Sequence, residues 1–248
     1  MSEDEGVLTL GESFLLLGFG PAYARLAHRL VGLGFLALRA ETLEDALGTL
    51  QLADPPVRAF LLPPAPPLPE LGPSLRWLAE RSLDGNLRAA VVGARPGPEA
   101  VARLRGAGVA LALFDPFTDG ELRFVLNFLA YNPRCGEWRS RLRVPTRLDA
   151  QLTGETRAKE ARVYNLSADG AYLEMAEPAE AGSQLVLELP LPSGPLRVAA
   201  RVLTSREPSP WHRETLPRGM GVRFHDVGPA ARESLERFID ERARSFQL

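Results

Sequence analysis

Several kinds of residue are scarce in this sequence, and each scarcity excludes a class of protein. A single cysteine, Cys135, excludes an internal disulfide, so we expect a cytoplasmic protein. The three histidines, His28, His212 and His225, lack the close spacing of a metal site. No apolar run approaches the ~20 residues that cross a bilayer, and the acidic N-terminus lacks the basic start of a secretory signal. We therefore expect no bound metal, no membrane insertion and no secretion.

Net charge is also low, but it is unevenly distributed along the chain. Residues 1–132 carry 11 arginines and 15 acidic residues, whereas residues 133–248 carry 18 basic and 16 acidic residues. Five of these basic residues fall within one short stretch, namely Arg134, Arg139, Arg141, Arg143 and Arg147. Neither half has the wide positive surface typical of proteins that bind a nucleic-acid polymer. A small anionic ligand fits this distribution better.

The first half of the chain alternates between short apolar runs and amphipathic stretches. The expected strands are Phe14–Phe19, Phe35–Arg39, Val57–Leu62, Leu87–Gly93 and Val109–Phe114, and the expected helices are Pro21–Gly32, Thr42–Leu52, Leu71–Leu83, Gly97–Gly106 and Thr118–Tyr131. Strands that are apolar along their whole length are typical of a parallel sheet covered on both faces. Five such units predict an α/β, doubly wound domain with a five-stranded parallel sheet over residues 1–131.

A different pattern begins after Asn132 and Pro133. The expected strands are Arg147–Leu152, Glu160–Leu166, Gly170–Glu174, Gln184–Leu189, Leu196–Ser205 and Gly219–Phe224. Short strands separated by turn residues predict a small β-barrel. An amphipathic helix is expected at Pro229–Arg244, with Leu235, Phe238 and Ile239 on one face. The chain thus divides into an α/β domain at residues 1–131, a linker at 132–146 and a barrel domain at 147–248.

The first domain resembles the receiver domain of two-component signalling. The likeness depends on the five strand–helix units and on Phe114-Asp115-Pro116-Phe117, which stands where receivers carry Lys-Pro-Phe. A phosphorylatable receiver also needs an acidic pair that holds Mg²⁺, an aspartate after the third strand and a Ser or Thr after the fourth. At these four places the sequence reads Gly18-Phe19, Leu62-Pro63, Gly93-Ala94 and Asp115. The resemblance therefore implies a receiver-like domain without phosphorylation, which serves as a docking or dimerisation platform.

Gly18 and Gly20 raise the alternative of a dinucleotide-binding turn. That pattern requires a third glycine three residues after the second, where this chain has Tyr23. A tight turn between strand and helix is the simpler interpretation.

Two separated motifs in the second half are the most specific features of the sequence. The first is Arg139-Ser140-Arg141-Leu142-Arg143, and the second is Asn165-Leu166-Ser167-Ala168-Asp169-Gly170. Together they resemble the PilZ domain, a small β-barrel that binds cyclic di-GMP and carries Arg-x-x-x-Arg followed by Asp/Asn-x-Ser-x-x-Gly. Gly219–Phe224 and the C-terminal helix also fit this family. The resemblance covers about residues 135–245.

This resemblance implies that Arg139 and Arg143 hold the phosphate and guanine groups, while Asn165, Ser167 and Gly170 form the barrel side of the site. Arginine suits both groups, because it binds phosphate or a guanine edge with two hydrogen bonds and stacks on the base. Gly170 lacks a side chain, which permits positive φ and a close approach of the backbone to the ligand. Arg141 is a further candidate contact, with a solvated surface position as the alternative.

The sequence therefore predicts an effector that binds cyclic di-GMP, changes the orientation of its two domains and signals to a protein partner. The alternative is a PilZ-fold interaction scaffold that no longer binds the nucleotide. An enzyme is not expected, because the chain shows neither a metal cluster nor a nucleophile with a positioned base. The expected partners are cyclic di-GMP and an unidentified protein, with no cofactor, no nucleic-acid polymer and no membrane insertion. A homodimer is left open.

Overall fold

The computed structural model describes residues 11–68, 70–82, 85, 87–109, 111–130, 143–153, 159–206 and 216–248. These residues form two compact units. The first unit comprises the described residues between 11 and 130 together with 246–248, and the second comprises those between 143 and 206 together with 216–245. Among the described helices, none has the length and apolar character that a membrane span requires.

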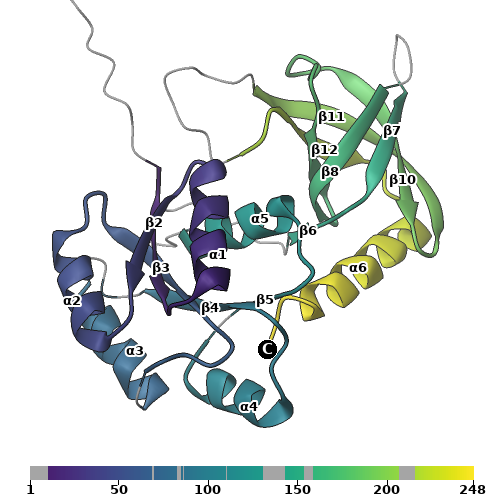
Figure 1. Cartoon of the computed structure of the whole chain (residues 1–248). Coiled ribbons are helices and arrows are strands. Elements are labelled where there is room, and N and C mark those ends of the chain that lie inside the picture. Colours follow the sequence, from purple (N-terminus) through teal and green to yellow (C-terminus); the bar gives the residue numbers. More distant parts are fainter. Residues whose placement is uncertain are drawn as a thin grey trace, which may run out of the picture. The chain divides into compact units, whose positions relative to one another are not determined.

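The first unit is a parallel sheet between two layers of helices (Figure 1). Its elements are β1 (Ser13–Leu17), α1 (Pro21–Gly32), β2 (Leu36–Ala40), α2 (Leu43–Leu52), β3 (Val57–Leu62), α3 (Leu71–Glu80), β4 (Arg88–Gly93), α4 (Pro98–Gly106), β5 (Leu111–Phe114) and α5 (Asp119–Ala130). The strands are parallel and lie in the order β2-β1-β3-β4-β5. This order is that of the doubly wound folds that include receivers, so the expected fold is confirmed.

The apolar strands of this unit supply two cores, one on each face of the sheet. Along β1, Phe14 and Leu16 belong to the core covered by α1 and α5, whereas Leu15 and Leu17 belong to the core covered by α2, α3 and α4. All four side chains are at most 1% exposed. The uninterrupted apolar run was therefore a correct sign of burial on both faces.

The C-terminal residues 246–248 belong to the first unit, although the sequence placed them in the barrel domain. The amide of Ala112, on the edge strand β5, donates a hydrogen bond of 2.9 Å to the carbonyl of Phe246. The Phe246 side chain is buried among the residues that pack against α1 and α5. Burial of an aromatic ring stabilises this position of the tail.

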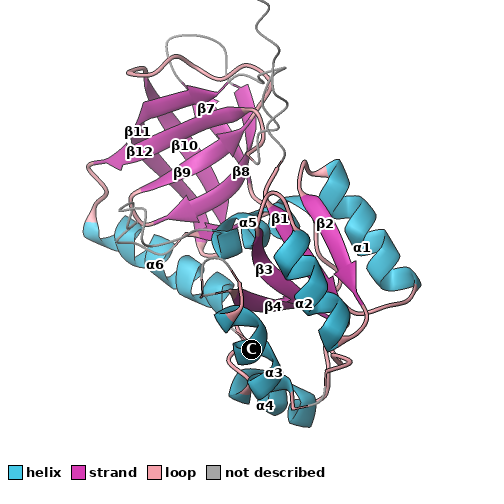
Figure 2. Ribbon diagram, turned by 90° about the vertical axis from the view of Figure 1, so that its left-hand side faces the viewer, coloured by secondary structure: helices cyan, strands magenta, loops and turns pink. Residues whose placement is uncertain are grey.

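The second unit is a closed barrel with one helix (Figure 2). Its elements are β6 (Val144–Pro145), β7 (Asp149–Thr153), β8 (Lys159–Ser167), β9 (Gly170–Glu174), β10 (Gln184–Leu191), β11 (Gly194–Arg206), β12 (Gly219–His225) and α6 (Pro229–Arg244). The antiparallel order β8-β7-β10-β11-β12-β9 closes because β9 also pairs with β8. The barrel has six strands, and β6 pairs with β8 as an added short strand.

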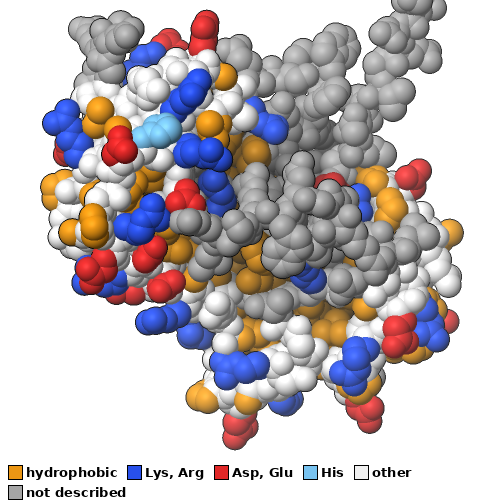
Figure 3. Space-filling view, turned by 180° about the vertical axis from the view of Figure 1, so that it is seen from behind, with side chains coloured by type: hydrophobic (Ala, Val, Ile, Leu, Met, Phe, Trp, Pro, Cys, Tyr) orange, Lys and Arg blue, Asp and Glu red, His pale blue; other side chains and the backbone are white. Residues whose placement is uncertain are grey.

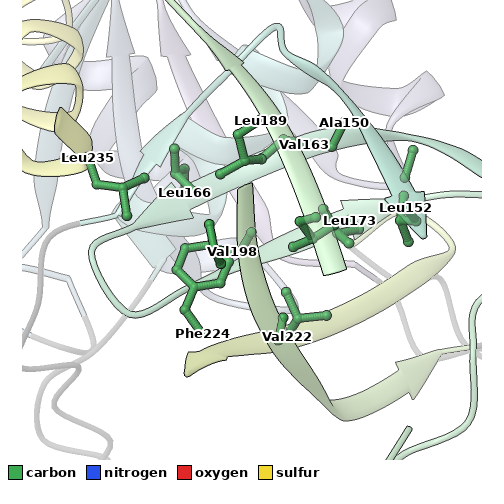
Figure 4. Close-up of a cluster of buried hydrophobic side chains, with 14 of the residues drawn as sticks. Ala150, Leu152, Val163, Leu166, Leu173, Leu189, Val198, Val222, Phe224 and Leu235 are labelled. Atoms are coloured by element: carbon green, nitrogen blue, oxygen red, sulfur yellow. The ribbon is translucent and has the colours of Figure 1, made fainter. Parts of the chain in front are cut away.

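Alternate residues of the barrel strands form its core, and α6 packs against that core. Figure 4 shows Val163, Leu173 and Val222 among the side chains gathered inside the barrel. From α6, Leu235 and Ile239 are buried in the same cluster, with Phe238 packed beside them. The face predicted for this helix is therefore confirmed.

Strand β6 lies inside the expected linker at residues 132–146, of which residues 132–142 lie outside the described residues. Val144 and Pro145 pair with Leu166 and Asn165 on β8 and are both buried. Proline lacks a donor and is tolerated on an edge strand, which explains how β6 can contain it. The first strand of the barrel unit thus begins one residue after Arg143, so the end of the first motif is anchored to the barrel.

Candidate ligand-binding site

Strand β6 and its surroundings hold the backbone next to Arg143. Beyond the pairing with β8, the hydroxyl of Thr146 donates to the carbonyl of Val163, and its amide donates to the carbonyl of Tyr164 at 3.4 Å. On the other side, Arg242 of α6 donates through Nε to the carbonyl of Pro145 at 3.0 Å. These bonds fix the chain directly after the first motif.

Arg143 joins the two motifs predicted to form the site. Its Nη1 donates a hydrogen bond of 2.8 Å to Oδ1 of Asn165, 22 residues later in the sequence. Asn165 is 6% exposed and Arg143 is partly buried, so water screens this bond only weakly. The structure therefore brings together one residue from each predicted motif.

A bulge in β8 places Asn165 on the outer side of the barrel. The pairing of β8 with β9 shifts between Val163 and Asn165, where Tyr164 is the extra residue. Val163 and Leu166 both belong to the barrel core, although they are three residues apart. A bulge of this kind redirects the side chains that follow it. Asn165 and Ser167 consequently share the outer face, next to β6.

Ser167 and Gly170 close the turn between β8 and β9. The hydroxyl of Ser167 donates a hydrogen bond of 3.1 Å to the carbonyl of Gly170, and Ser167 is 3% exposed. Only Ala168 and Asp169 lie between the two strands. The second motif is therefore a tight hairpin with its polar side chains already hydrogen-bonded.

Gly170 has a structural role that differs from the one inferred from the sequence. Its φ is not among the positive values that the structure records. A Cβ at this position would lie 2.2 Å from the carbonyl oxygen of Val222 on β12. The missing side chain lets β9 and β12 approach and close the barrel. Contact of Gly170 with a ligand remains a prediction.

Two arginines of α6, Arg232 and Arg242, contact residues beside the site and were not singled out by the sequence analysis. The backbone carbonyl of Asp169 accepts a hydrogen bond of 2.8 Å from the amide of Phe224. The carboxylate of Asp169 lies 3.4 Å from Nη1 of Arg232 on α6. Arg242 holds Pro145 as described above. Because both arginines are more than 60 residues away from their partners, no local motif could have revealed them.

Two predicted ligand contacts, Arg139 and Arg141, lie outside the described residues, as do Cys135 and His212. Their roles remain predictions.

The receiver-like positions of the first unit lie at the carboxyl ends of its strands. Gly18 follows β1, Pro63 and Pro64 follow β3, and Gly93 ends β4. A Cβ on Gly18 would lie 3.2 Å from the ring of Pro63, and one on Gly93 would lie 3.4 Å from the ring of Pro64. Proline rings thus pack where a receiver carries its acidic groups. Within the described residues, no group of three or more His, Cys, Asp or Glu side chains is suited to hold a metal ion.

The turn that contains Gly18 and Gly20 has the features of a tight strand–helix connection. Gly20 adopts a φ of 95° directly before α1. Tyr23, at the position where a dinucleotide-binding turn has glycine, is 5% exposed, and burial raises the pKa of its hydroxyl well above the ordinary value.

Comparisons with solved structures find similar folds for both halves. The PilZ domain of YcgR from Escherichia coli, solved with c-di-GMP, is 24% identical, covers 44% of this chain and 93% of its own, and has a TM-score of 0.36. The Bacillus subtilis inhibitor of motility MotI/DgrA is 21% identical over 44% of this chain and 52% of its own, with a TM-score of 0.37. The receiver domain of the Pseudomonas aeruginosa sensor histidine kinase PA1611 is 18% identical over 48% of this chain and 98% of its own, with a TM-score of 0.40.

The matches to MotI/DgrA thus span about half of that protein. No curated protein matches the sequence.

A family model decides the identity of the second half. It is the model of the PilZ domain, and it matches residues 137–241. This span contains Arg139 and Arg143 of the first motif, the whole second motif, the closed barrel and most of α6. The barrel half of this chain is a PilZ domain.

Proposed function

We propose that this protein is a receptor and adaptor for cyclic di-GMP. Arg139 and Arg143 bind the ligand from one side, with Arg141 beside them. The barrel corner formed by Asn165, Ser167 and Gly170 binds it from the other side. The observation that supports this proposal best is the 2.8 Å hydrogen bond between Arg143 and Asn165, which joins the two motifs within the PilZ span.

The chemistry of these residues suits a ligand with two phosphates and two guanines. A guanidinium group carries five N–H donors in a planar array. Arginine binds phosphate oxygens, or the O6 and N7 atoms of guanine, in a planar two-bond geometry. The amide of Asn165 and the hydroxyl of Ser167 add short polar groups that are held by the hairpin.

We further propose that ligand binding changes the orientation of the two units and so signals to a protein partner. Residues 131–142 connect the units in the sequence, and Arg143 directly precedes β6. Fixing a residue costs about 1–2 kcal/mol of conformational entropy, and a hydrogen bond to a charged group returns about 1.5–3 kcal/mol. The bonds that both motif arginines make at one corner can therefore offset the cost of fixing a few residues.

The receiver-like unit is proposed to act as a docking platform and not as an enzyme. Glycine and proline occupy its strand ends at the places where phosphoryl transfer needs carboxylates. Catalysis requires a nucleophile, a base or a metal placed together, and the motifs of this chain supply binding groups instead.

Isothermal titration of the full chain with cyclic di-GMP tests the proposal. We expect saturable binding by the native protein and at least about 100-fold weaker binding by Arg143→Ala. The variant lacks the guanidinium group that is proposed to bind the ligand, and it leaves Asn165 without its charged partner. Arg237→Ala, on the exposed side of α6, is the control and should bind like the native protein. Energy transfer between labels on the two units should change with ligand only in the native protein and the control.

Each other outcome has a definite meaning. If the native protein shows no saturable binding, the chain is a PilZ-fold scaffold that has lost its ligand. If Arg143→Ala binds with native affinity, the site is assigned to the wrong residues.

A further inference from the structure

A row of residues crosses the outside of the barrel from the predicted site. Strand pairing sets Ser167 opposite Gly170, Gly170 opposite Arg223, Arg223 opposite Arg201, and Arg201 opposite Gln184. We call these five residues the outer row. They come from β8, β9, β12, β11 and β10 in turn, so the row connects the second motif to two arginines that lie outside both predicted binding motifs.

The alternation of β12 and β11 shows that the two arginines of this row face outward. On β12, Val222 and Phe224 belong to the barrel core and lie on either side of Arg223. On β11, Ala200 and Val202 belong to the same core and flank Arg201. Because successive side chains of a strand point to opposite faces, both arginines project from the outer surface. Both are exposed, and Figure 3 shows basic side chains gathered on one face of the barrel unit.

The two arginines repel each other, since like charges directly opposite on neighbouring strands destabilise a sheet. Neither guanidinium forms a hydrogen bond or an ion pair with any residue that the structure describes. The nearby carboxylate of Asp169 lies instead against Arg232. By contrast, Arg197 on the same face of β11 stands opposite Glu188 of β10. Arg197 thus faces an acidic residue on the neighbouring strand, whereas Arg201 and Arg223 face each other.

The position of this pair points to an anion at the same site. Neighbouring strands are about 4.8 Å apart, so Arg223 stands two strands, or about 10 Å, from Ser167. Gly170 lies between them and has no side chain to block the surface. A long arginine side chain can reach over this gap toward a ligand bound at the second motif.

We propose that Arg223 and Arg201 form a second phosphate-binding part of the cyclic dinucleotide site. This inference depends on the proposed function and extends it. Arg143 binds one side of the ligand at the corner with Asn165. Arg223 binds a phosphate that extends over Gly170, and Arg201 strengthens the positive field from one strand farther away. Occupation by a phosphate also relieves the repulsion between the two guanidinium groups.

Titration of the full chain with cyclic di-GMP tests this inference. We expect Arg223→Gln to raise Kd about tenfold and Arg201→Gln about threefold, because a hydrogen bond between charged groups is lost in the first and only a longer-range attraction in the second. The matched control is Arg197→Gln, on the same face of β11, which should stay within about twofold of the native Kd. The double variant should also lose less affinity than the native protein between about 50 mM and 500 mM salt.

Thermal unfolding separates lost binding from lost folding. Removal of one member of a repelling pair should leave Tm unchanged or raise it slightly. If Arg223→Gln and Arg201→Gln bind like Arg197→Gln, the outer row is not part of the site, while the proposed function stands. If neither the native protein nor Arg197→Gln binds cyclic di-GMP, the proposed function and this inference both fail.

Discussion

At the carboxyl ends of its strands the first unit carries glycines and prolines. The barrel instead carries Arg143 hydrogen-bonded to Asn165, and Ser167 hydrogen-bonded to the carbonyl of Gly170 in the β8–β9 hairpin. Both units keep a well-packed core of the expected kind. The packing of the cores therefore does not distinguish the two units. The polar side chains at the strand ends and turns do distinguish them. A fold can be retained for its surface after its reacting groups are gone, because the core and the site depend on different residues.

The largest effect is expected from Gly170, where the barrel site and the barrel core meet. Gly170→Ala would place a Cβ 2.2 Å from the Val222 carbonyl, so β9 and β12 would have to separate. We expect a loss of about 3 kcal/mol in the free energy of unfolding, measured by urea denaturation. Gly228→Ala is the control, because nothing lies within 4 Å of a Cβ there. Equal stability of the two variants would show that the missing side chain does not matter for closure.

A smaller effect is expected from the partner of Arg143. Asn165→Ala removes the acceptor of the 2.8 Å bond and should weaken cyclic di-GMP binding about 10- to 100-fold, because a hydrogen bond to a charged group contributes about 1.5–3 kcal/mol. Asn165→Asp keeps an acceptor for the guanidinium and should restore most of the affinity. The measurement is calorimetric titration of both variants. Equal binding by Asn165→Ala and the native protein would remove Asn165 from the site.

No effect is expected from phosphodonor chemistry on the first unit. Incubation with Mg²⁺ and acetyl phosphate should leave the mass of the protein unchanged, because Leu62 and Pro63 stand where a receiver has its acceptor aspartate. Intact-mass spectrometry makes the measurement, with a phosphorylatable receiver as the positive control. Addition of one phosphoryl group to residues 11–130 would contradict the view that the first unit has no phosphorylation chemistry.

Most elements could be predicted from the sequence because local patterns specify them. The apolar run of β3 at Val57–Leu62, the helix α1 at Pro21–Gly32 and the helix α6 at Pro229–Arg244 have the predicted bounds. At the start of the predicted helix Thr42–Leu52, Thr42 and Asp45 form both hydrogen bonds of a capping box. These features depend on residues within one or two turns of each other, which a single sequence displays directly.

The candidate site was only partly predictable. The second motif indicated Asn165 and Ser167, and the first indicated Arg143, because each belongs to a short pattern with a clear chemical use. No short sequence pattern predicts the bulge at Tyr164 that turns Asn165 outward, because the bulge depends on which residues of β8 and β9 pair. The same is true of the close contact between Gly170 and Val222, which the sequence analysis explained by ligand approach instead.

By itself the sequence determined the two fold types, the order of their elements and the short motifs that favour the barrel as the proposed binding half. Only the tertiary structure decided that Arg143 meets Asn165, that Asp169 meets Arg232 and that Arg201 and Arg223 extend the row from Gly170. The physical reason is that hydrophobic alternation and turn residues act over a few positions. Strand pairing, which joins residues more than 50 positions apart such as Gly170 and Arg223, is set when the barrel closes.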